Sequence, residues 1–215
     1  MVNILNNPKS LYAEAIRTIK TNIKYSSADR NKKVILITSS EAGEGKSTIS
    51  ANLALSLSQD NKKVILIDGD LRKPSVHRQF RISAKEGLSE VLIGEKELEK
   101  TKVKIDDNLD IIPSGHIPPN PAELLASDKM EEILNTLREE YDYVIIDTNP
   151  LGIVADSQIL SSKVDGVVLV AKYGSSKKEN LITCKKLIDQ VGGKVIGVVI
   201  NMVNSNNNKY YYYYN

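Results

Sequence analysis

The chain has 215 residues, 41% of them hydrophobic and 26% charged, which is ordinary usage for one globular domain and excludes a disordered or collagen-like protein. The formal net charge of +2 gives little support to nucleic-acid binding, which usually shows as a clustered basic face. The only cysteine, Cys184, excludes internal disulfides and cysteine-rich metal sites, and it suits a reducing cytoplasm. The first residues lack the pattern of a signal peptide, and no run of ~18 apolar residues occurs, so we expect the chain itself neither to cross nor to enter a membrane.

The hydrophobic pattern predicts helices and strands in alternation, beginning with a helix at about residues 8–27. Short β-branched stretches, apolar on both faces, predict strands at 32–40, 62–70, 108–115, 141–150, 164–174 and 193–202. Helical spacing predicts helices at 46–60, 120–141 and 175–193, and one short helix around "GLSEVLIG" in the less regular segment 75–107. This alternation indicates an α/β fold with a doubly wound, mostly parallel sheet, as one domain over residues 1–203.

The segment "SSEAGEGKST", residues 39–48, carries the strongest chemical signal. It joins a predicted buried strand to a predicted helix, which places backbone N–H groups and a helix N-terminus around phosphate oxygens. Lys46 would reach the β- and γ-phosphates, and Ser47 would offer a hydroxyl to Mg²⁺. Ser40 replaces the first glycine of the usual pattern, and the alternative is a strand–helix turn without a ligand. The expected nucleotide-binding residues are Ala42, Gly43, Glu44, Gly45, Lys46, Ser47 and Thr48.

Aspartates end two further predicted strands. In "VIIDTNP", Asp147 occupies the place of a Walker B residue, which holds Mg²⁺. In "VILIDGDLRKP", Asp68 and Asp70 lie two residues apart on an expected strand end and would point the same way, followed by Arg72 and Lys73. Each aspartate could instead be an ordinary cap or turn residue. Beside a phosphate loop, we expect them to provide metal, base and phosphate contacts in one place.

The three motifs together resemble the Walker A, Walker A′ and Walker B motifs of bacterial tyrosine kinases, the P-loop autokinases of capsular and exopolysaccharide synthesis. The similarity spans about residues 10–203, and the Asp-x-Asp-x-Arg core is its distinctive part. It implies ATP and Mg²⁺ as cofactors and a fold of the partitioning and division-site ATPase type. The implied catalytic residues are Lys46, Asp68 as the base, Asp70, Arg72 and Asp147, and the implied metal ligands are Ser47, Asp70 and Asp147.

The resemblance extends to both ends of the domain. Asn201 matches an asparagine that contacts adenine, although it could equally be a strand-end turn residue. Glu14, Arg17 and Lys20 lie on roughly one polar edge of the first helix and resemble a motif that builds homo-oligomeric rings, of which an octamer is one size. The alternative is a solvated helix face with weak ion pairs. The family also implies a separate transmembrane activator that recruits the cytoplasmic kinase to the inner face of the membrane, and a cognate tyrosine phosphatase.

Five consecutive tyrosines, Tyr210, Tyr211, Tyr212, Tyr213 and Tyr214, stand in the low-complexity segment 204–215. Its asparagine-rich composition cannot build a core, so we expect a flexible, disordered tail. Exposed hydroxyls along an extended chain suit phosphoacceptors, and the resemblance implies autophosphorylation there, between neighbouring subunits. The alternative is a sticky aromatic tail.

Two other classes share parts of this pattern. Partitioning and division-site ATPases use similar motifs as nucleotide switches, but they carry a signature lysine early in the phosphate loop, where this chain has Ser40 and Glu41. A degraded kinase that serves as a scaffold would have lost catalytic residues, and all the candidates are present. The family often has proline at the positions of Ala42 and Asn149, so the sequence leaves open the shape of the loop after Asp147.

Overall fold

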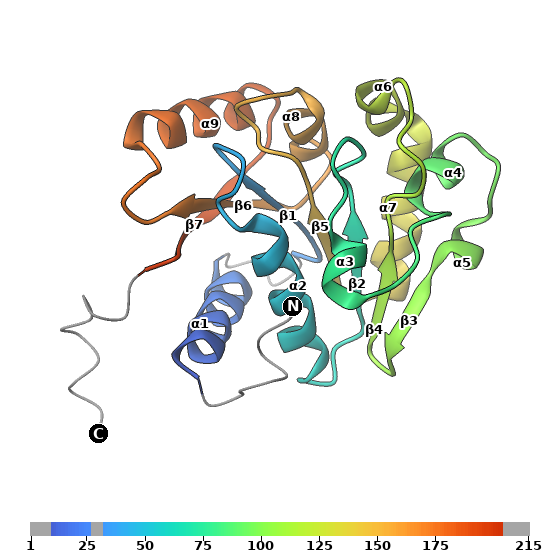
Figure 1. Ribbon diagram of the computed structural model, residues 1–215, viewed down its shortest axis with the longest axis horizontal. Coiled ribbons are helices and arrows are strands. Elements are labelled where there is room, and N and C mark those ends of the chain that lie inside the picture. Colours follow the sequence, from blue (N-terminus) through green and yellow to red (C-terminus); the bar gives the residue numbers. More distant parts are fainter. Residues whose placement is uncertain (1–9, 27–31, 204–215) are drawn as a thin grey trace.

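Within the residues that the computed structural model describes, 10–26 and 32–203, seven strands form one sheet at the centre of the molecule (Figure 1). The strands are β1 (Val34–Ser39), β2 (Val64–Asp68), β3 (Val103–Asp106), β4 (Leu109–Ile112), β5 (Tyr143–Asp147), β6 (Gly166–Lys172) and β7 (Val195–Asn201). Their order is β3-β4-β2-β5-β1-β6-β7, and every neighbouring pair is parallel except β3 and β4. The predicted doubly wound, mostly parallel sheet is confirmed. The tyrosine cluster lies outside the described residues.

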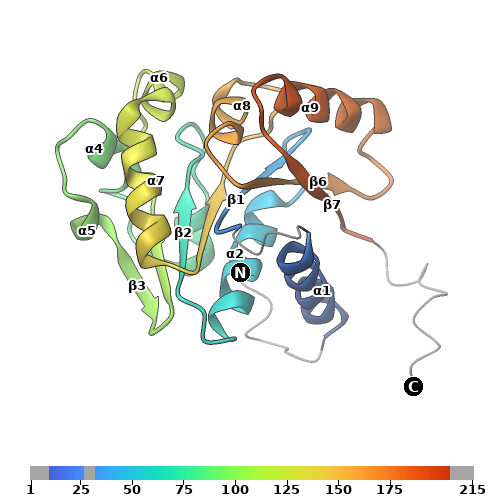
Figure 2. The ribbon, with the colours of Figure 1, turned by 180° about the vertical axis from the view of Figure 1, so that it is seen from behind.

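Helices cover both faces of this sheet (Figures 1 and 2). They are α1 (Leu11–Tyr25), α2 (Lys46–Ser58), α3 (Val76–Phe80), α4 (Leu88–Leu92), α5 (Leu98–Thr101), α6 (Pro121–Ala126), α7 (Asp128–Glu140), α8 (Asp156–Ser161) and α9 (Lys178–Gln190). Side chains of α1, α2 and α3 pack in one core cluster, and those of α4, α6, α7, α8 and α9 pack in a second cluster. The strands contribute alternate side chains to each cluster, which explains why their sequences are apolar throughout.

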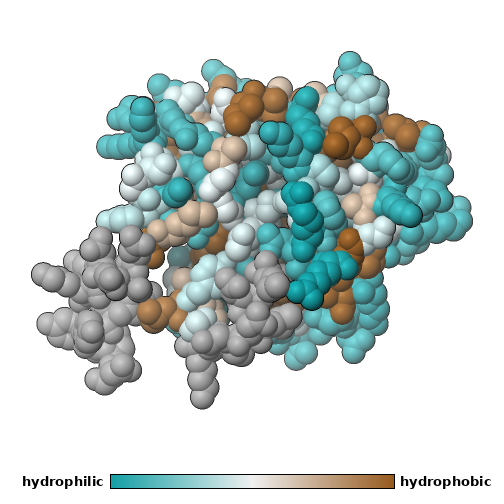
Figure 3. Space-filling model, viewed as in Figure 1, coloured by the Kyte–Doolittle hydropathy of each residue, from teal (hydrophilic) through white to brown (hydrophobic). Residues whose placement is uncertain are grey.

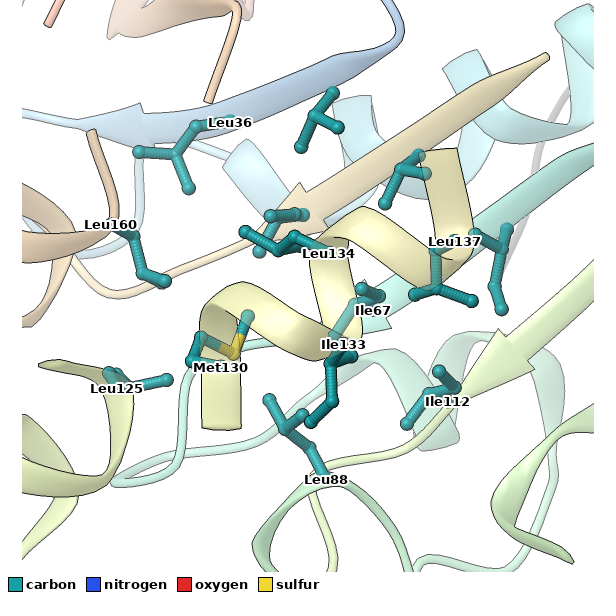
Figure 4. Close-up of a cluster of buried hydrophobic side chains, with 14 of the residues drawn as sticks. Leu36, Ile67, Leu88, Ile112, Leu125, Met130, Ile133, Leu134, Leu137 and Leu160 are labelled. Carbon is teal, nitrogen blue, oxygen red and sulfur yellow. The ribbon is translucent and has the colours of Figure 1, made fainter. Parts of the chain in front are cut away.

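Helix α7 shows how the sequence positions a helix on the sheet. Met130, Ile133, Leu134 and Leu137 recur at three- and four-residue spacing and are all buried. Figure 4 shows these side chains in the core beside the strands, with Ile67 of β2 among their neighbours. Burial of one such side chain stabilises the fold by about 1.5–3 kcal/mol, so this stripe holds the helix in place.

Helix α2 is unusual because it is buried on nearly every side, from Ile49 to Ser58. A helix without a polar face needs a cover on its outer side. Helix α1 provides that cover, since its residues Ala13, Ile16 and Ile23 share a core cluster with α2. The helix that follows the phosphate loop is therefore held between the sheet and α1.

The predicted helix at 120–141 is wrong as a single element, because α6 and α7 both lie in this segment. The chain is extended at Ser127, with φ −61° and ψ 157°, and the Ser127 hydroxyl accepts a hydrogen bond from the Met130 amide. Ser127 thus ends α6 and caps α7. In segment 75–107 the structure has α3, α5 and β3 besides the predicted short helix, which is α4, and α8 is a further element that periodicity does not predict.

The parallel strands all deliver their carboxyl ends to the same edge of the sheet. Ser39, Asp68, Asp147 and Asn201 are the last residues of β1, β2, β5 and β7 at this edge. The face seen in Figure 3 is largely hydrophilic, with hydrophobic residues in separate small patches. In the part of the chain that the structure describes, no helix is both long and apolar enough to span a bilayer.

Candidate active site

The loop between β1 and α2 has the backbone of a phosphate loop. Gly43 and Gly45 have φ of 79° and 89°, and α2 begins directly afterwards at Lys46. A Cβ atom on Gly45 would lie 2.1 Å from Asn201 Nδ2 and would also be strained at this positive φ, so the position favours glycine. The first N–H groups of α2 have no partner within the helix, and its positive dipole end favours an anion. The loop can therefore hold a phosphate.

Glu44 fixes the shape of this loop from the inside. Its buried carboxylate accepts hydrogen bonds from the Glu41 amide at 2.9 Å, from the Ser40 hydroxyl at 3.2 Å and from the Ser176 hydroxyl. Ser40 does not adopt a positive φ, so the glycine usual at this position is not required. The Glu44 side chain therefore has a structural role. The predicted contact of Glu44 with nucleotide could only be made by its backbone.

Asp68 and Asp147 end neighbouring parallel strands and are aligned in register. Both are fully buried. Asp68 Oδ2 accepts hydrogen bonds from the Ser75 and Val76 amides at 2.9 Å, and Asp147 Oδ1 accepts one from the Ser50 hydroxyl at 3.0 Å. Asp68 Oδ1 and Asp147 Oδ2 have no hydrogen-bond partner in the described part of the chain. Because buried polar atoms normally have partners, these two oxygens indicate a place for a ligand.

Burial makes these two carboxyl groups more basic than usual. Desolvation, followed by the charge of Asp147, raises the pKa of Asp68 to about 7. Desolvation also raises the pKa of Asp147, while Ser47 and Lys46 act in the opposite direction. These interactions bring the ends of the predicted Walker A and Walker B motifs together. A carboxylate whose pKa lies near neutrality can accept a proton under physiological conditions.

Asp70 lies in the turn after β2 and not on the strand. Because β2 ends at Asp68, the prediction that the strand extends as far as Asp70 is wrong. Asp70 Oδ1 accepts a hydrogen bond from the Lys73 amide at 2.9 Å and so stabilises the turn. Its charge nevertheless raises the pKa of both Asp68 and Asp147, which means that the three acids share one site.

The donor atoms suit a magnesium ion that is held partly by nucleotide. Within ranges 10–26 and 32–203, no group of three or more His, Cys, Asp or Glu residues could enclose a metal ion. Mg²⁺ at nucleotide sites commonly uses only one or two carboxylates, while phosphates and waters complete its coordination. Asp147, with its unpartnered Oδ2, could hold such an ion together with Asp70 and the Ser47 hydroxyl.

Asn201 lies against the phosphate loop. Its Nδ2 donates a hydrogen bond to the Glu44 carbonyl at 3.0 Å. Asn201 and Thr48 also line an open groove of about 720 Å³ between α1 and β7. The side chain predicted to contact adenine therefore stands between the phosphate loop and a cavity, and the contact itself stays a prediction.

The polar edge predicted on α1 is wrong for Lys20. Arg17 pairs with Glu14 on the exposed side of the helix. Lys20 pairs with Asp60 at 2.7 Å, and its side chain is only 17% exposed. Residues six apart on a helix point about 120° away from each other, which turns Lys20 toward the end of α2. Glu14 and Arg17 keep the outward position that an oligomer contact needs.

Ser50, Asp156 and Ser176 contribute contacts that the motifs do not predict. Ser50 lies one helical turn after Lys46, so helical spacing from the phosphate loop could have found it. Asp156 accepts hydrogen bonds from the Arg72 guanidinium at 2.8 and 3.0 Å, across 84 residues of sequence. No local signal marks Asp156 or Ser176.

The fold and the site together define a P-loop nucleotide-binding protein. Strand β1 leads through a glycine-containing loop into the buried helix α2. The neighbouring strands β2 and β5 end at aspartates that are aligned in register. The AAA domain family matches residues 32–194.

Known proteins narrow this class. Tyrosine-protein kinase YwqD of Bacillus subtilis strain 168 is 44% identical over 198 residues, which cover 92% of this chain and 84% of YwqD. The solved kinase domain of Escherichia coli tyrosine kinase ETK has a TM-score of 0.91 at 32% identity and covers 94% of this chain and 80% of that domain structure. The chain belongs to the bacterial tyrosine-protein kinases. The predicted family, fold and enzyme class are confirmed.

Two further comparisons set limits on this likeness. The chain spans only 28% of the length of the tyrosine-protein kinase etk of E. coli K12, so some relatives are much longer. The septum site-determining protein MinD of Pyrococcus horikoshii, solved with Mg-ADP, has a TM-score of 0.67 at 24% identity and covers 78% of this chain and 69% of that chain. That likeness shows the shared fold alone.

Proposed function

We propose that this kinase transfers the γ-phosphoryl group of ATP to Tyr210, Tyr211, Tyr212, Tyr213 and Tyr214 of a neighbouring copy of itself. The phenolic oxygen forms a bond to the γ-phosphorus, the bond from that phosphorus to the β–γ bridging oxygen breaks, and ADP leaves. The phenolic proton passes to the Asp68 carboxylate and then to water. Mg²⁺, when bound, neutralises charge on the β- and γ-phosphate oxygens.

The observation that carries this proposal is the state of Asp68. A tyrosine hydroxyl has a pKa near ~10, so it needs a proton acceptor at neutral pH. Asp68 has a buried oxygen without a partner and a pKa raised to about 7, which suits a general base. Lys46 at the start of α2 would neutralise the β- and γ-phosphates, and Arg72 would contribute a further positive charge to the phosphoryl group.

The direction of β7 supports delivery of the tail to such a site. β7 ends at Asn201, against the phosphate loop, so the chain continues from the catalytic edge of the sheet. Eight residues lie between Asn201 and Tyr210, and the nine steps along the chain span at most ~30 Å when extended and about 15–18 Å as a flexible coil. A neighbouring active site is within this reach if subunits pack side by side. Glu14 and Arg17, exposed on α1, are the contact residues that we propose for such a ring, of which an octamer is one size.

The setting of the reaction follows from the family resemblance. We propose that a transmembrane activator recruits this kinase from the cytoplasm to the inner face of the membrane. A cognate phosphatase would remove the phosphoryl groups, and the cycle would regulate capsular or exopolysaccharide synthesis and export. Neither the composition nor the site indicates a nucleic-acid partner.

One mixing experiment tests the proposal. A Lys46→Met chain with an intact tail is incubated with Mg-ATP and an active chain whose five tail tyrosines are replaced by phenylalanine. Phosphotyrosine on the Lys46→Met chain, detected by intact mass, is the expected result and shows transfer between copies. Lys62→Met, at an exposed lysine, is the matched control and should acquire phosphotyrosine when this variant is incubated alone with Mg-ATP. ATP hydrolysis without phosphotyrosine in any mixture would favour the alternative, a nucleotide switch of the partitioning type.

A further inference from the structure

Asp156 is a fully buried carboxylate at the start of α8, outside the Walker motifs. Its Oδ2 accepts hydrogen bonds from Arg72 Nε at 2.8 Å and from Asn149 Nδ2 at 2.7 Å. Its Oδ1 accepts one from Arg72 Nη2 at 3.0 Å. The guanidinium is thus held by two parallel hydrogen bonds, the geometry that fixes an arginine most firmly.

The same residues join the two loops that carry the catalytic aspartates. Arg72 follows Asp70 in the turn after β2, and Asn149 follows Asp147 in the loop after β5. The Asn149 carbonyl accepts hydrogen bonds from the Ser157 hydroxyl at 2.6 Å and from the Thr38 hydroxyl at 2.8 Å. The beginning of α8 is therefore fastened to the loop after Asp147, and Arg72 is fastened to α8.

This arrangement gives a role to the side-chain amide of Asn149. A proline at this position could shape the loop but could not donate a hydrogen bond to Asp156. In this chain the amide of Asn149 supplies one of the three hydrogen bonds that Asp156 accepts. Asn149 therefore belongs to the support of Arg72.

We propose that Asp156 is a positioning residue for phosphoryl transfer, which fixes the Arg72 guanidinium so that Nη1 faces the transferring phosphoryl group. The inference rests on the proposed kinase reaction. Arg72 is itself 41% exposed on its side chain, while Asp156 is 0% exposed, so the pair consists of a rigid buried anchor and an arm at the surface of the site. The Asp156 bonds occupy Nε and Nη2 and leave the donors of Nη1 for a phosphate.

The geometry explains why an anchor is needed. A free arginine side chain loses rotamer entropy when it is fixed, and a misplacement of ~1 Å can lower a reaction rate about 100-fold. Asp156 fixes the arm before ATP or tyrosine arrives. If the ion pair were purely structural, it would hold α8 to the sheet, and its loss would lower stability without changing the rate through Arg72.

Four variants test this inference in the full chain, with tail phosphorylation as the assay. We expect Arg72→Ala and Asp156→Asn each to lower kcat about 10-fold or more with little change in KM for ATP. The double variant should be no slower than Arg72→Ala, because Asp156 acts through Arg72. Arg72→Lys keeps the charge at an exposed position and cannot make the two parallel bonds, so it should be nearly as slow as Arg72→Ala. Asp165→Asn is the matched control for loss of an ion pair, because it removes the carboxylate that pairs with Arg138 outside the site. This variant should keep its kcat.

Added guanidinium provides a readout that stability alone would not move. Guanidinium should restore part of the kcat of Arg72→Ala, where the Asp156 carboxylate remains, and it should restore nothing in the double variant. Additive losses in the double variant, equal rescue of both proteins, or a fast Arg72→Lys enzyme would overturn the inference. If Arg72→Ala itself keeps its full rate while Lys46→Met is inactive, the positioning role is wrong and the kinase reaction stands.

Discussion

Replacement of Asp68 by asparagine should stabilise the nucleotide-free protein while it slows phosphoryl transfer. Asparagine has nearly the same shape, and its side-chain oxygen can accept the hydrogen bonds that the Ser75 and Val76 amides now donate to Oδ2. The substitution removes a buried charge beside Asp147. It also removes the proton acceptor, so transfer should fall while ATP binding largely persists.

The magnitude follows from the pKa of Asp68, which folding raises from 3.8 to about 7. The folded state holds this proton more tightly than the unfolded chain, so wild-type stability falls as the pH rises from about 4 to about 7. At 1.36 kcal/mol per pH unit, this loss is at most ~4 kcal/mol. Part of this loss comes from repulsion between Asp68 and Asp147, and the NH₂ group of the new asparagine needs a hydrogen-bond acceptor. We therefore expect Asp68→Asn to raise the free energy of unfolding by about 2 kcal/mol at pH 8.

Urea unfolding in the presence of EDTA, at about pH 5 and pH 8, measures this gain. The free energy of unfolding of Asp68→Asn should exceed that of the wild type by about 2 kcal/mol at pH 8 and by clearly less at pH 5. Asp107→Asn is the matched control, because Asp107 is an exposed carboxylate paired with Lys104, and it should change stability little at either pH. An Asp68→Asn protein that is no more stable than the wild type at pH 8 would refute the reasoning.

Three further predictions concern the nucleotide. Lys46→Met should abolish tail phosphorylation and leave the circular dichroism spectrum unchanged, since Lys46 lies at the half-buried start of α2 and belongs to neither core cluster; residual labelling would contradict its role. Gly45→Ala should weaken Mg-ATP binding more than tenfold by calorimetry, because its Cβ would lie 2.1 Å from Asn201 Nδ2. Gly43→Ala, where φ is 79° but no atom lies within 4 Å of the new Cβ, should lose clearly less affinity, and equal losses would disprove the steric argument. Asn201→Leu should narrow the preference for ATP over GTP, measured as the ratio of the two affinities; an unchanged ratio would make Asn201 a strand-end residue only.

The sequence predicts this site well where the chemistry is local. The strand, loop and helix of the phosphate loop lie in one continuous segment, and hydrophobic periodicity marks both flanking elements, so Lys46 and Ser47 are placed by a single motif. Periodicity does not predict the break at Ser127, because the apolar spacing continues past this residue, which caps α7 in the structure. Asp156 escapes it as well, since the hydrogen bonds to Arg72 join residues 84 positions apart. A pattern of spacing carries no information about such a pair.

Because α1 covers α2, it limits how far this protein can be truncated without loss of its fold. The family match spans residues 32–194, and a fragment with those ends would lack α1 and all of β7. Such a fragment would expose the side of α2 that α1 covers in the intact protein, and it would leave β6 as an unpaired edge of apolar residues. Exposed apolar helices and open strand edges promote self-association. We therefore expect the smallest piece that folds as this kinase does to extend beyond residues 32–194 at both ends, and a fragment with those ends to aggregate.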